Sequence, residues 1–121
     1  MKKIPILIGL SFILSNGVIA NQITVPRLTV QMLIAYYSGQ IGTLFHEQSA
    51  DAIIKTRLAN GYLAGVADST QGKVWCDKGK MKIDEINSMV VAELRKLSTK
   101  DQDKSAAQAV IRILETKLPC K

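Results

Sequence analysis

The sequence predicts an all-α domain, and three observations support this. After Pro26, apolar residues recur at three- and four-residue steps and do not alternate over the length of a strand. Good helix formers such as Ala, Leu, Lys, Glu and Gln fill the chain. Polar, turn-forming clusters at residues 69–72 and 98–104 separate the periodic segments. We therefore expect a small four-helix-type domain.

Residues 1–20 have the pattern of a secretory signal peptide. Lys2 and Lys3 form a positive n-region, an apolar stretch follows, and the small residue Ala20 precedes the expected cleavage site. The apolar stretch is shorter than the about 20 residues that a spanning helix needs. We therefore expect export to the periplasm, one mature domain at residues 21–121, and no membrane partner after cleavage.

The charge of the mature domain is mildly basic. The formal net charge of the chain is +6, and removal of Lys2 and Lys3 leaves +4. The lysines are scattered apart from one concentration at residues 73–82, and Trp75 is the only tryptophan. Nucleic-acid binding needs a basic stripe with aromatic side chains for stacking. We therefore expect no nucleic-acid partner.

The first two helices are expected at residues 28–38, ending at Gly39, and at residues 49–68. Gly61, Tyr62 and Gly65 are the unusual feature of the second helix, because each glycine costs about 1 kcal/mol relative to alanine. The two glycines fall on or near one side of the helix, where another backbone could approach closely. Packing within the monomer is favoured, while a seam between two copies and a ligand site stay open. The residues on or near that side are Ala50, Ile53, Ile54, Leu58, Gly61, Tyr62 and Gly65.

The last two helices are expected at residues 83–97 and 105–118, with Ser105 as the N-cap of the fourth helix. Asp84 and Glu85 open the third helix and suit the helix dipole. The residues expected to face the core are Ile83, Ile86, Val90, Leu94 and Leu97 in the third helix and Ala107, Val110, Ile111, Leu114 and Leu118 in the fourth.

The two cysteines, Cys76 and Cys120, are expected to form a disulfide. An exported chain meets an oxidising compartment, and each cysteine has one possible partner within the chain. Closing a loop of about 45 residues stabilises a fold by about 4 kcal/mol. Because Cys76 precedes the third helix and Cys120 follows the fourth, the bridge staples the C-terminal helical hairpin. The polar loop at residues 98–104 then projects at the opposite end.

The residues of the chain form no recognisable catalytic or metal-binding set. His46 is the only histidine, whereas a structural zinc site needs four ligands and a cysteine nucleophile needs a base beside it. Asp101 and Asp103 fit a solvated loop better than a hydrolase pair. We therefore expect a binding role, with no enzyme activity, cofactor or metal.

An ordered set of motifs resembles a known family. The motifs are Gly61-Tyr62-Leu63-Ala64-Gly65-Val66-Ala67-Asp68, Trp75-Cys76, and Ser105-Ala106-Ala107 in a helix that leads to Leu118-Pro119-Cys120. In these motifs the chain resembles the Rap/Tai immunity proteins of type VI secretion. The resemblance implies a small periplasmic helical protein, often a homodimer, whose partner is a peptidoglycan amidase, a cysteine hydrolase injected by neighbouring cells. Such a protein occludes the cleft of the amidase without performing chemistry.

The expected fold suggests where such a partner would bind. The projecting loop would reach toward the amidase cleft, and the exposed side of the third helix would add contact area. A loop that is rigid before binding loses less entropy on binding. The predicted contact residues are Glu85, Ser88 and Ala92 in the helix and Ser98, Thr99, Lys100, Asp101, Gln102, Asp103 and Lys104 in the loop.

Two other classes of protein fit some of these features. A small periplasmic acid-stress chaperone is also helical, exported, basic, dimeric and held by one disulfide. It would dissociate and expose an apolar surface at about pH 2 to 3, near or below the carboxylate pKa range. An enzyme that used Cys76 or Cys120 as its nucleophile would instead need a free thiol with a lowered pKa.

Overall fold

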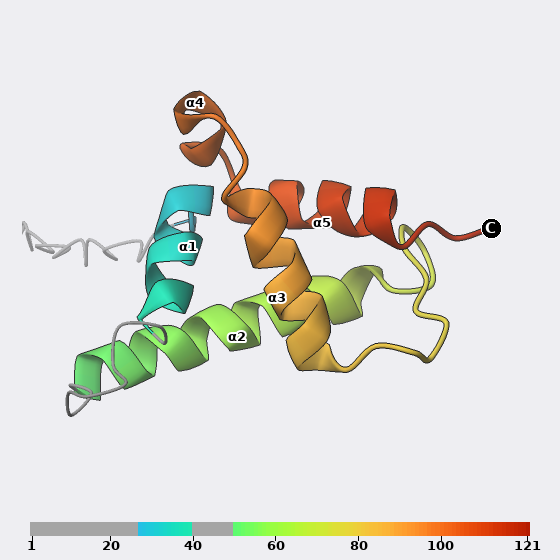
Figure 1. Cartoon of the computed structure of the whole chain (residues 1–121), viewed down its shortest axis with the longest axis horizontal. Helices are drawn as coiled ribbons and strands as arrows, with labels where there is room; N and C mark the ends of the chain where they lie inside the picture. The colour runs from blue at the N-terminus through green and yellow to red at the C-terminus, as the bar shows by residue number, and fades with distance from the viewer. Residues whose placement is uncertain (1–26, 40–49) are drawn as a thin grey trace, which may run out of the picture.

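The computed structural model describes residues 27–39 and 50–121, so the expectations for the signal peptide, Ser49 and His46 lie outside the described residues. The described residues form five helices and no strand, which confirms the expected all-α class (Figure 1). Four of the helices match the expected ones, with ends within three residues of the predicted positions. The helices are α1 Val30–Ser38, α2 Ala50–Thr70, α3 Ile83–Leu94, α4 Thr99–Gln102 and α5 Ala106–Lys117.

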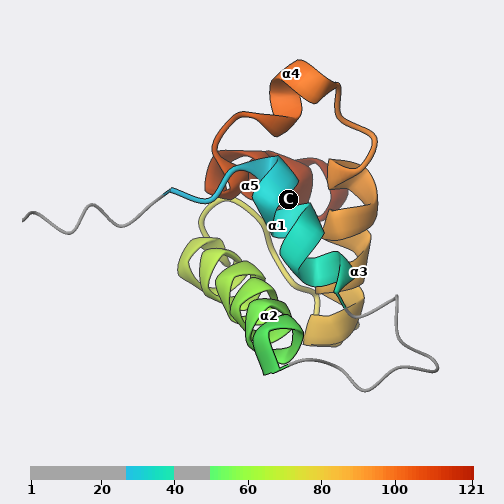
Figure 2. The same ribbon diagram turned by 90° about the vertical axis from the view of Figure 1, so that its left-hand side faces the viewer.

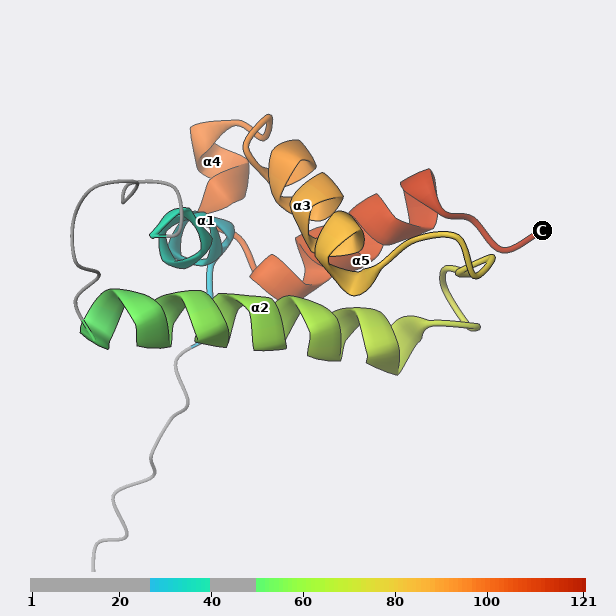
Figure 3. The ribbon, with the colours of Figure 1, turned by 60° about the horizontal axis from the view of Figure 1, so that its bottom comes forward.

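The helices pack in two layers. Figure 3 shows α2 running along one side of the molecule, with α1, α3 and α5 on the other side. The helix α2 contacts each of these three helices, and the three also contact one another. The hydrophobic core therefore lies between α2 and the layer formed by α1, α3 and α5.

The core is formed by aliphatic side chains, small alanines and one tryptophan. Burying a Val or Leu side chain contributes about 1.5–3 kcal/mol relative to leaving it in water. The alanines let neighbouring helices approach α2 and α5 closely. The buried residues are Val30 and Leu33 in α1, Thr56, Ala59, Leu63 and Ala67 in α2, Ile86, Asn87, Val90, Val91 and Leu94 in α3, Ala106, Val110 and Leu114 in α5, and Trp75.

The core residues predicted for α3 and α5 are mostly right. Ile83 is an exception, because it is the first residue of α3 and its side chain is 49% exposed. In α5, Ala106 is buried whereas the predicted Ala107 is only half-buried. The confirmed buried residues are Ile86, Val90, Leu94, Val110 and Leu114, and the half-buried ones are Leu97, Ala107, Ile111 and Leu118.

The N-termini of α1 and α5 lie side by side. Thr29 caps α1, and its Oγ1 accepts the backbone N–H of Met32 at 3.2 Å. Ser105 stands at the N-cap of α5 as predicted, but its side chain makes no capping hydrogen bond. The N–H of Ala106 instead donates to the carbonyl of Leu28 at 2.9 Å. A backbone contact between segments far apart in the sequence therefore satisfies a donor that a side chain would otherwise cap.

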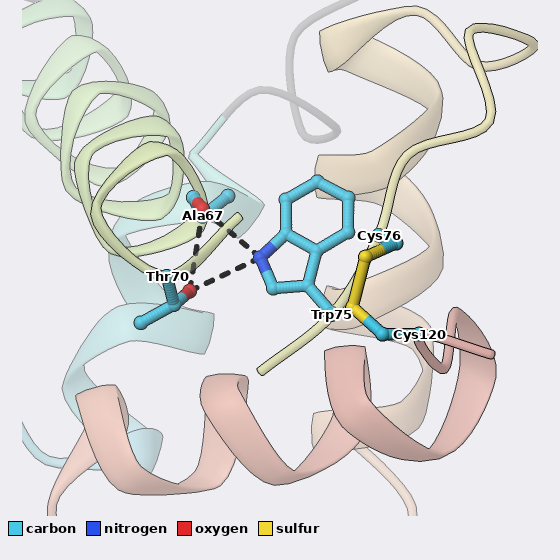
Figure 4. The surroundings of a disulfide bond; sticks show 5 residues. All are labelled: Ala67, Thr70, Trp75, Cys76 and Cys120. Carbon is cyan, nitrogen blue, oxygen red and sulfur yellow. Dashed lines mark hydrogen bonds between the residues drawn. A yellow bond between two sulfur atoms is a disulfide. The ribbon is translucent and has the colours of Figure 1, made fainter. Parts of the chain in front are cut away.

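The disulfide between Cys76 and Cys120 is formed as predicted, with a Cα–Cα distance of 4.8 Å. Cys76 lies in the connector between α2 and α3, so the bridge ties the end of α5 to this connector (Figure 4). Trp75 is buried beside it, and its indole N–H donates to the carbonyl of Ala67 at 2.9 Å and to Oγ1 of Thr70 at 3.0 Å. The connector is therefore fixed to α2 on one side and to the C-terminus on the other.

Candidate functional site

Residues 98–104 were expected to form a rigid, projecting polar loop, and the structure shows that they contain the helical turn α4. The hydroxyl of Ser98, at the N-cap, accepts the N–H of Asp101 at 3.2 Å and donates to the Asp101 carboxylate at 2.8 Å. The ammonium group of Lys104 donates to the other carboxylate oxygen at 2.7 Å. The hydrogen bonds from Lys104 and then Ser98 lower the pKa of Asp101. Local side chains thus impose helical order that the polar composition did not indicate.

The α4 segment is also fixed to the rest of the domain. The carbonyl of Lys104 accepts the N–H of Val30, the first residue of α1, at 3.0 Å. The side-chain amide of Gln102 donates to the carbonyl of Leu97 at 3.1 Å. In Figures 1 and 2, α4 projects beyond the other helices. The segment is therefore a projecting element that is already ordered in the monomer.

The outward side of this segment is polar. Asp101 and Gln102 are half-buried, because they make the contacts described above. Lys100 and Asp103 take part in no ion pair among the described residues, whereas Lys104 is paired with Asp101. The exposed residues of the segment are Ser98, Thr99, Lys100, Asp103 and Lys104.

Glu85, Ser88 and Ala92 lie on the exposed side of α3, as expected. Two of them already have partners within the chain. The Glu85 carboxylate accepts the N–H of Lys82 at 2.8 Å, and the Ser88 hydroxyl lies 3.1 Å from the hydroxyl of Tyr37 on α1. Ala92 lies toward the α4 end of the helix, and Glu85 lies about 10 Å further along the axis, at 1.5 Å per residue. A partner that contacts all three residues must therefore follow most of α3.

A small hollow beside α4 includes a residue that the sequence did not single out. Arg112 of α5 lines it together with Asp101 and Lys104, and its volume is about 160 Å³. Arg112 has ordinary spacing on an amphipathic helix, so no sequence signal distinguishes it from a solvated arginine. The apolar residues of the hollow are Leu97, Ala109 and Ile113.

Comparison with known proteins identifies the family. A family model described as Rap1a immunity proteins matches residues 29–120. The chain belongs to this family. The match includes every helix that the structure describes and both cysteines, and it confirms the resemblance predicted from the motifs. A search of curated proteins found no match. Membership in the Rap1a immunity proteins implies that the chain binds a cognate effector protein.

The outer side of α2 is the second surface of interest in this member of the Rap1a immunity proteins. Ile54 and Leu58 are 65% and 51% exposed, and Gly61 and Gly65 continue the same side of the helix. A Cβ atom added at either glycine would meet no atom within 4 Å. The favoured interpretation, packing of this glycine pair within the monomer, is therefore not seen among the described residues.

An apolar groove borders this side of α2. Its volume is about 720 Å³, and Tyr62 contributes to its wall together with Leu58. The sequence indicated Tyr62 through its place between the glycines, but nothing in the sequence indicated that α1 forms the opposite wall. The lining residues are Arg27, Leu28, Met32, Tyr36, Leu58, Tyr62, Ser105, Ala107 and Gln108.

Three further observations concern free thiols, metal ligands and membrane-spanning helices. Both cysteines are held in the disulfide, so neither is available as the thiol nucleophile that the enzyme alternative needs. Within residues 27–39 and 50–121, no group of three or more His, Cys, Asp and Glu side chains could hold a metal ion. No helix in the described part of the chain is long and apolar enough to cross a membrane.

Proposed function

We propose that this chain protects its cell by binding a type VI secretion peptidoglycan amidase in the periplasm and occluding the active-site cleft of that enzyme. The observation that carries this proposal is α4, a projecting turn held in shape by Asp101 and anchored to α1 through Lys104. Membership in the Rap1a immunity proteins supplies the general role, and α4 supplies a means of filling a cleft.

The order of α4 favours tight binding. A segment that is ordered before it meets its partner loses less conformational entropy on binding. Lys100 and Asp103 stand outward with no ion pair among the described residues, so they are suited to meet opposite charges at the rim of a cleft. We propose that the exposed side of α3, through Glu85, Ser88 and Ala92, adds contact area.

The location in the periplasm rests on two features. Residues 1–20 have the signal-peptide pattern described above. The disulfide between Cys76 and Cys120 needs an oxidising compartment to persist. The role requires no catalysis by this chain, because blocking a cleft needs only shape and charge complementarity.

We further propose that two copies of the chain associate through the outer side of α2. Ile54, Leu58, Gly61 and Gly65 recur at four- and three-residue steps, which places two apolar side chains and two glycines in one row. Open glycine positions let a second helix approach closely, and the exposed leucine and isoleucine would gain from burial.

The deciding experiment is a titration of the mature, oxidised protein against candidate peptidoglycan amidases, with peptidoglycan cleavage as the readout. We expect stoichiometric loss of activity at nanomolar protein for the cognate amidase. Absence of inhibition across amidases of the cysteine-hydrolase class would contradict the proposal. The same chain with its disulfide reduced is the control, because reduction removes a bond that stabilises the folded state.

A further inference from the structure

Lysines gather at the end of the molecule that contains the disulfide. Sequence order places them in two groups, one in the connector between α2 and α3 and one at the C-terminus. The bond between Cys76 and Cys120 joins these two segments, which lie beside each other in Figures 1 and 3. We call this region the basic end, and its exposed lysines are Lys73, Lys78, Lys80, Lys82, Lys117 and Lys121.

Two carboxylates in and beside the connector accept backbone N–H groups and form no ion pair with the lysines of the basic end. Asp77 accepts the backbone N–H of Gly79 at 2.9 Å, and Glu85 accepts the N–H of Lys82 at 2.8 Å. Of the six lysines, only Lys117 takes part in an ion pair among the described residues, with its Nζ 3.1 Å from Glu93. Because the other five form no ion pair among the described residues, their ammonium groups are available to an external anion.

The basic end combines these charges with apolar surface. A hollow of about 290 Å³ opens there, with Lys78, Lys80 and Lys117 among its lining residues. Met81 lines this hollow and also a neighbouring one that includes the half-exposed Ile83. The other apolar lining residues of the first hollow are Leu118 and Pro119.

We propose that the basic end binds the surface of an anionic lipid bilayer. Juxtaposed lysines are attracted to the negative headgroup layer, and apolar side chains among them can enter its boundary with the acyl chains. Lysine is a flexible point charge, which suits a diffuse negative surface. Protein interfaces are instead enriched in arginine and depleted in lysine. The basic end contains no arginine, so the composition favours a lipid surface over an acidic protein.

This proposal departs from the expectation drawn from the sequence, which predicted no membrane partner. In the sequence four of the six lysines lie together at residues 73–82, and the fold brings Lys117 and Lys121 beside them through the disulfide and the hydrogen bond from the N–H of Cys76 to the carbonyl of Leu118. The α4 segment lies away from the C-terminal end in Figures 1 and 3. A chain bound to lipid through the basic end would therefore leave α4 accessible. The lipid proposal does not depend on the proposed function.

The test is co-sedimentation of the mature, oxidised protein with phosphatidylcholine vesicles that either contain or lack phosphatidylglycerol. We expect binding only to the vesicles that contain phosphatidylglycerol. Raising the ionic strength from about 0.1 M to about 1 M shortens the Debye length from about 10 Å to about 3 Å, and binding should fall at least about tenfold. This salt dependence needs no variant, so it tests the proposal independently of folding.

Two triple variants with the same loss of charge locate the site. The connector variant should lose binding at least about tenfold, and the control variant should retain most of it. Circular dichroism verifies that both variants fold. The connector variant is Lys78→Gln, Lys80→Gln and Lys82→Gln, and the control is Lys55→Gln, Arg57→Gln and Lys96→Gln.

Three results would overturn the proposal. Equal loss in both variants would mean that net charge alone attracts the protein. Equal binding to both kinds of vesicle would exclude an electrostatic lipid site. Absence of vesicle binding, together with binding to an acidic polypeptide that the connector variant loses, would assign the basic end to a protein partner.

Discussion

The carboxylate of Asp101 lies 2.7 Å from the ammonium group of Lys104, across the short helix α4. The same carboxylate accepts a hydrogen bond from Ser98 at 2.8 Å, so it connects the two ends of the turn. Asp101 therefore positions α4, although the sequence suggested it as a contact residue equal to Asp103. Asp103 is exposed and takes part in no ion pair among the described residues.

Replacing Asp101 with asparagine should loosen α4. The Asp101→Asn variant keeps the shape of the side chain but removes the charge that attracts Lys104. We expect faster hydrogen exchange of the α4 amides and faster dissociation from the inhibited effector, by about three- to tenfold, because the entropy of ordering is then lost on binding. Exchange measured by mass spectrometry and dissociation measured by surface plasmon resonance provide the two readouts.

The matched control is Asp103→Asn, which removes the same charge without breaking an ion pair that the structure shows among the described residues. This variant should leave the exchange of α4 unchanged and should slow association, because a charge at the rim of an interface steers the encounter. Identical behaviour of the two variants in both assays would contradict the separate roles of Asp101 and Asp103.

Loss of the disulfide should cost much of the stability. Replacing Cys76 and Cys120 with serine opens a loop with a sequence separation of 44 residues, and the chain-entropy model predicts a loss of about 4 kcal/mol. We expect a lower urea midpoint, followed by the fluorescence of Trp75, which is buried beside the bridge. The reduced wild-type chain is the control and should have the same midpoint as the serine variant. A midpoint unchanged by either treatment would show that the bridge does not stabilise the fold.

Substitution of a glycine in α2 can show whether the outer side of this helix is a free surface or the interface between two copies of the chain. Because a Cβ at Gly61 would meet no atom within 4 Å, Gly61→Ala should stabilise a monomer by about 0.5–1 kcal/mol through helix propensity. In a dimer that packs on this side, the added methyl group should weaken association.

Light scattering coupled to gel filtration measures the mass, and thermal unfolding measures the stability. Leu58→Glu is the companion variant, because its side chain is 51% exposed and a charge there should disrupt a dimer while leaving the monomer folded. A chain that is monomeric before either substitution would contradict the proposed homodimer.

The sequence allowed most of the fold to be predicted, and most of the parts it did not predict depend on contacts between segments that are distant in the sequence. The spacing of Ile86, Val90 and Leu94 identified the buried side of α3, because helix periodicity is a local property. The order within α4 comes from local contacts of Asp101 with Ser98 and Lys104, which the polar composition did not indicate, whereas the anchoring of α4 to α1 through Lys104 has no local signature. The outward orientation of Gly61 was missed, because periodicity groups residues on one side of a helix without showing which side meets the core.

Some residues of the candidate site could likewise be predicted from the local pattern, and others could not. The exposed positions of Glu85, Ser88 and Ala92 followed from the pattern of α3. Arg112 joins the hollow beside α4 only through the packing of α5. The basic end likewise is complete only in the fold, where the disulfide and the hydrogen bond from Cys76 to Leu118 bring the C-terminus to the connector.

The pH dependence of stability provides the last prediction. Hydrogen bonds from Lys96 and Lys117 lower the pKa of Glu93 from its usual value of 4.5. A carboxyl whose pKa is lower in the folded state stabilises the fold above its unfolded pKa, and this contribution is lost as the pH falls through the folded pKa. The pKa of Asp101 is lowered too, so its contribution has the same sign. The urea midpoint should therefore be level between about pH 5 and 8 and should decline below about pH 4.

The variant Glu93→Gln should make this decline only slightly less steep, because solvent screens an ion pair at the surface and its contribution to stability is small.

The same pH titration distinguishes an immunity protein from an acid-stress chaperone. For an immunity protein we expect dye binding and loss of helicity to occur together on acidification, because the proposed contact through Ile54, Leu58, Gly61 and Gly65 includes no carboxylate whose protonation would separate two folded copies. A step in dye binding and dissociation at about pH 3 with the helices intact would favour the chaperone, because protonated carboxylates would then have released a concealed apolar surface from a folded chain.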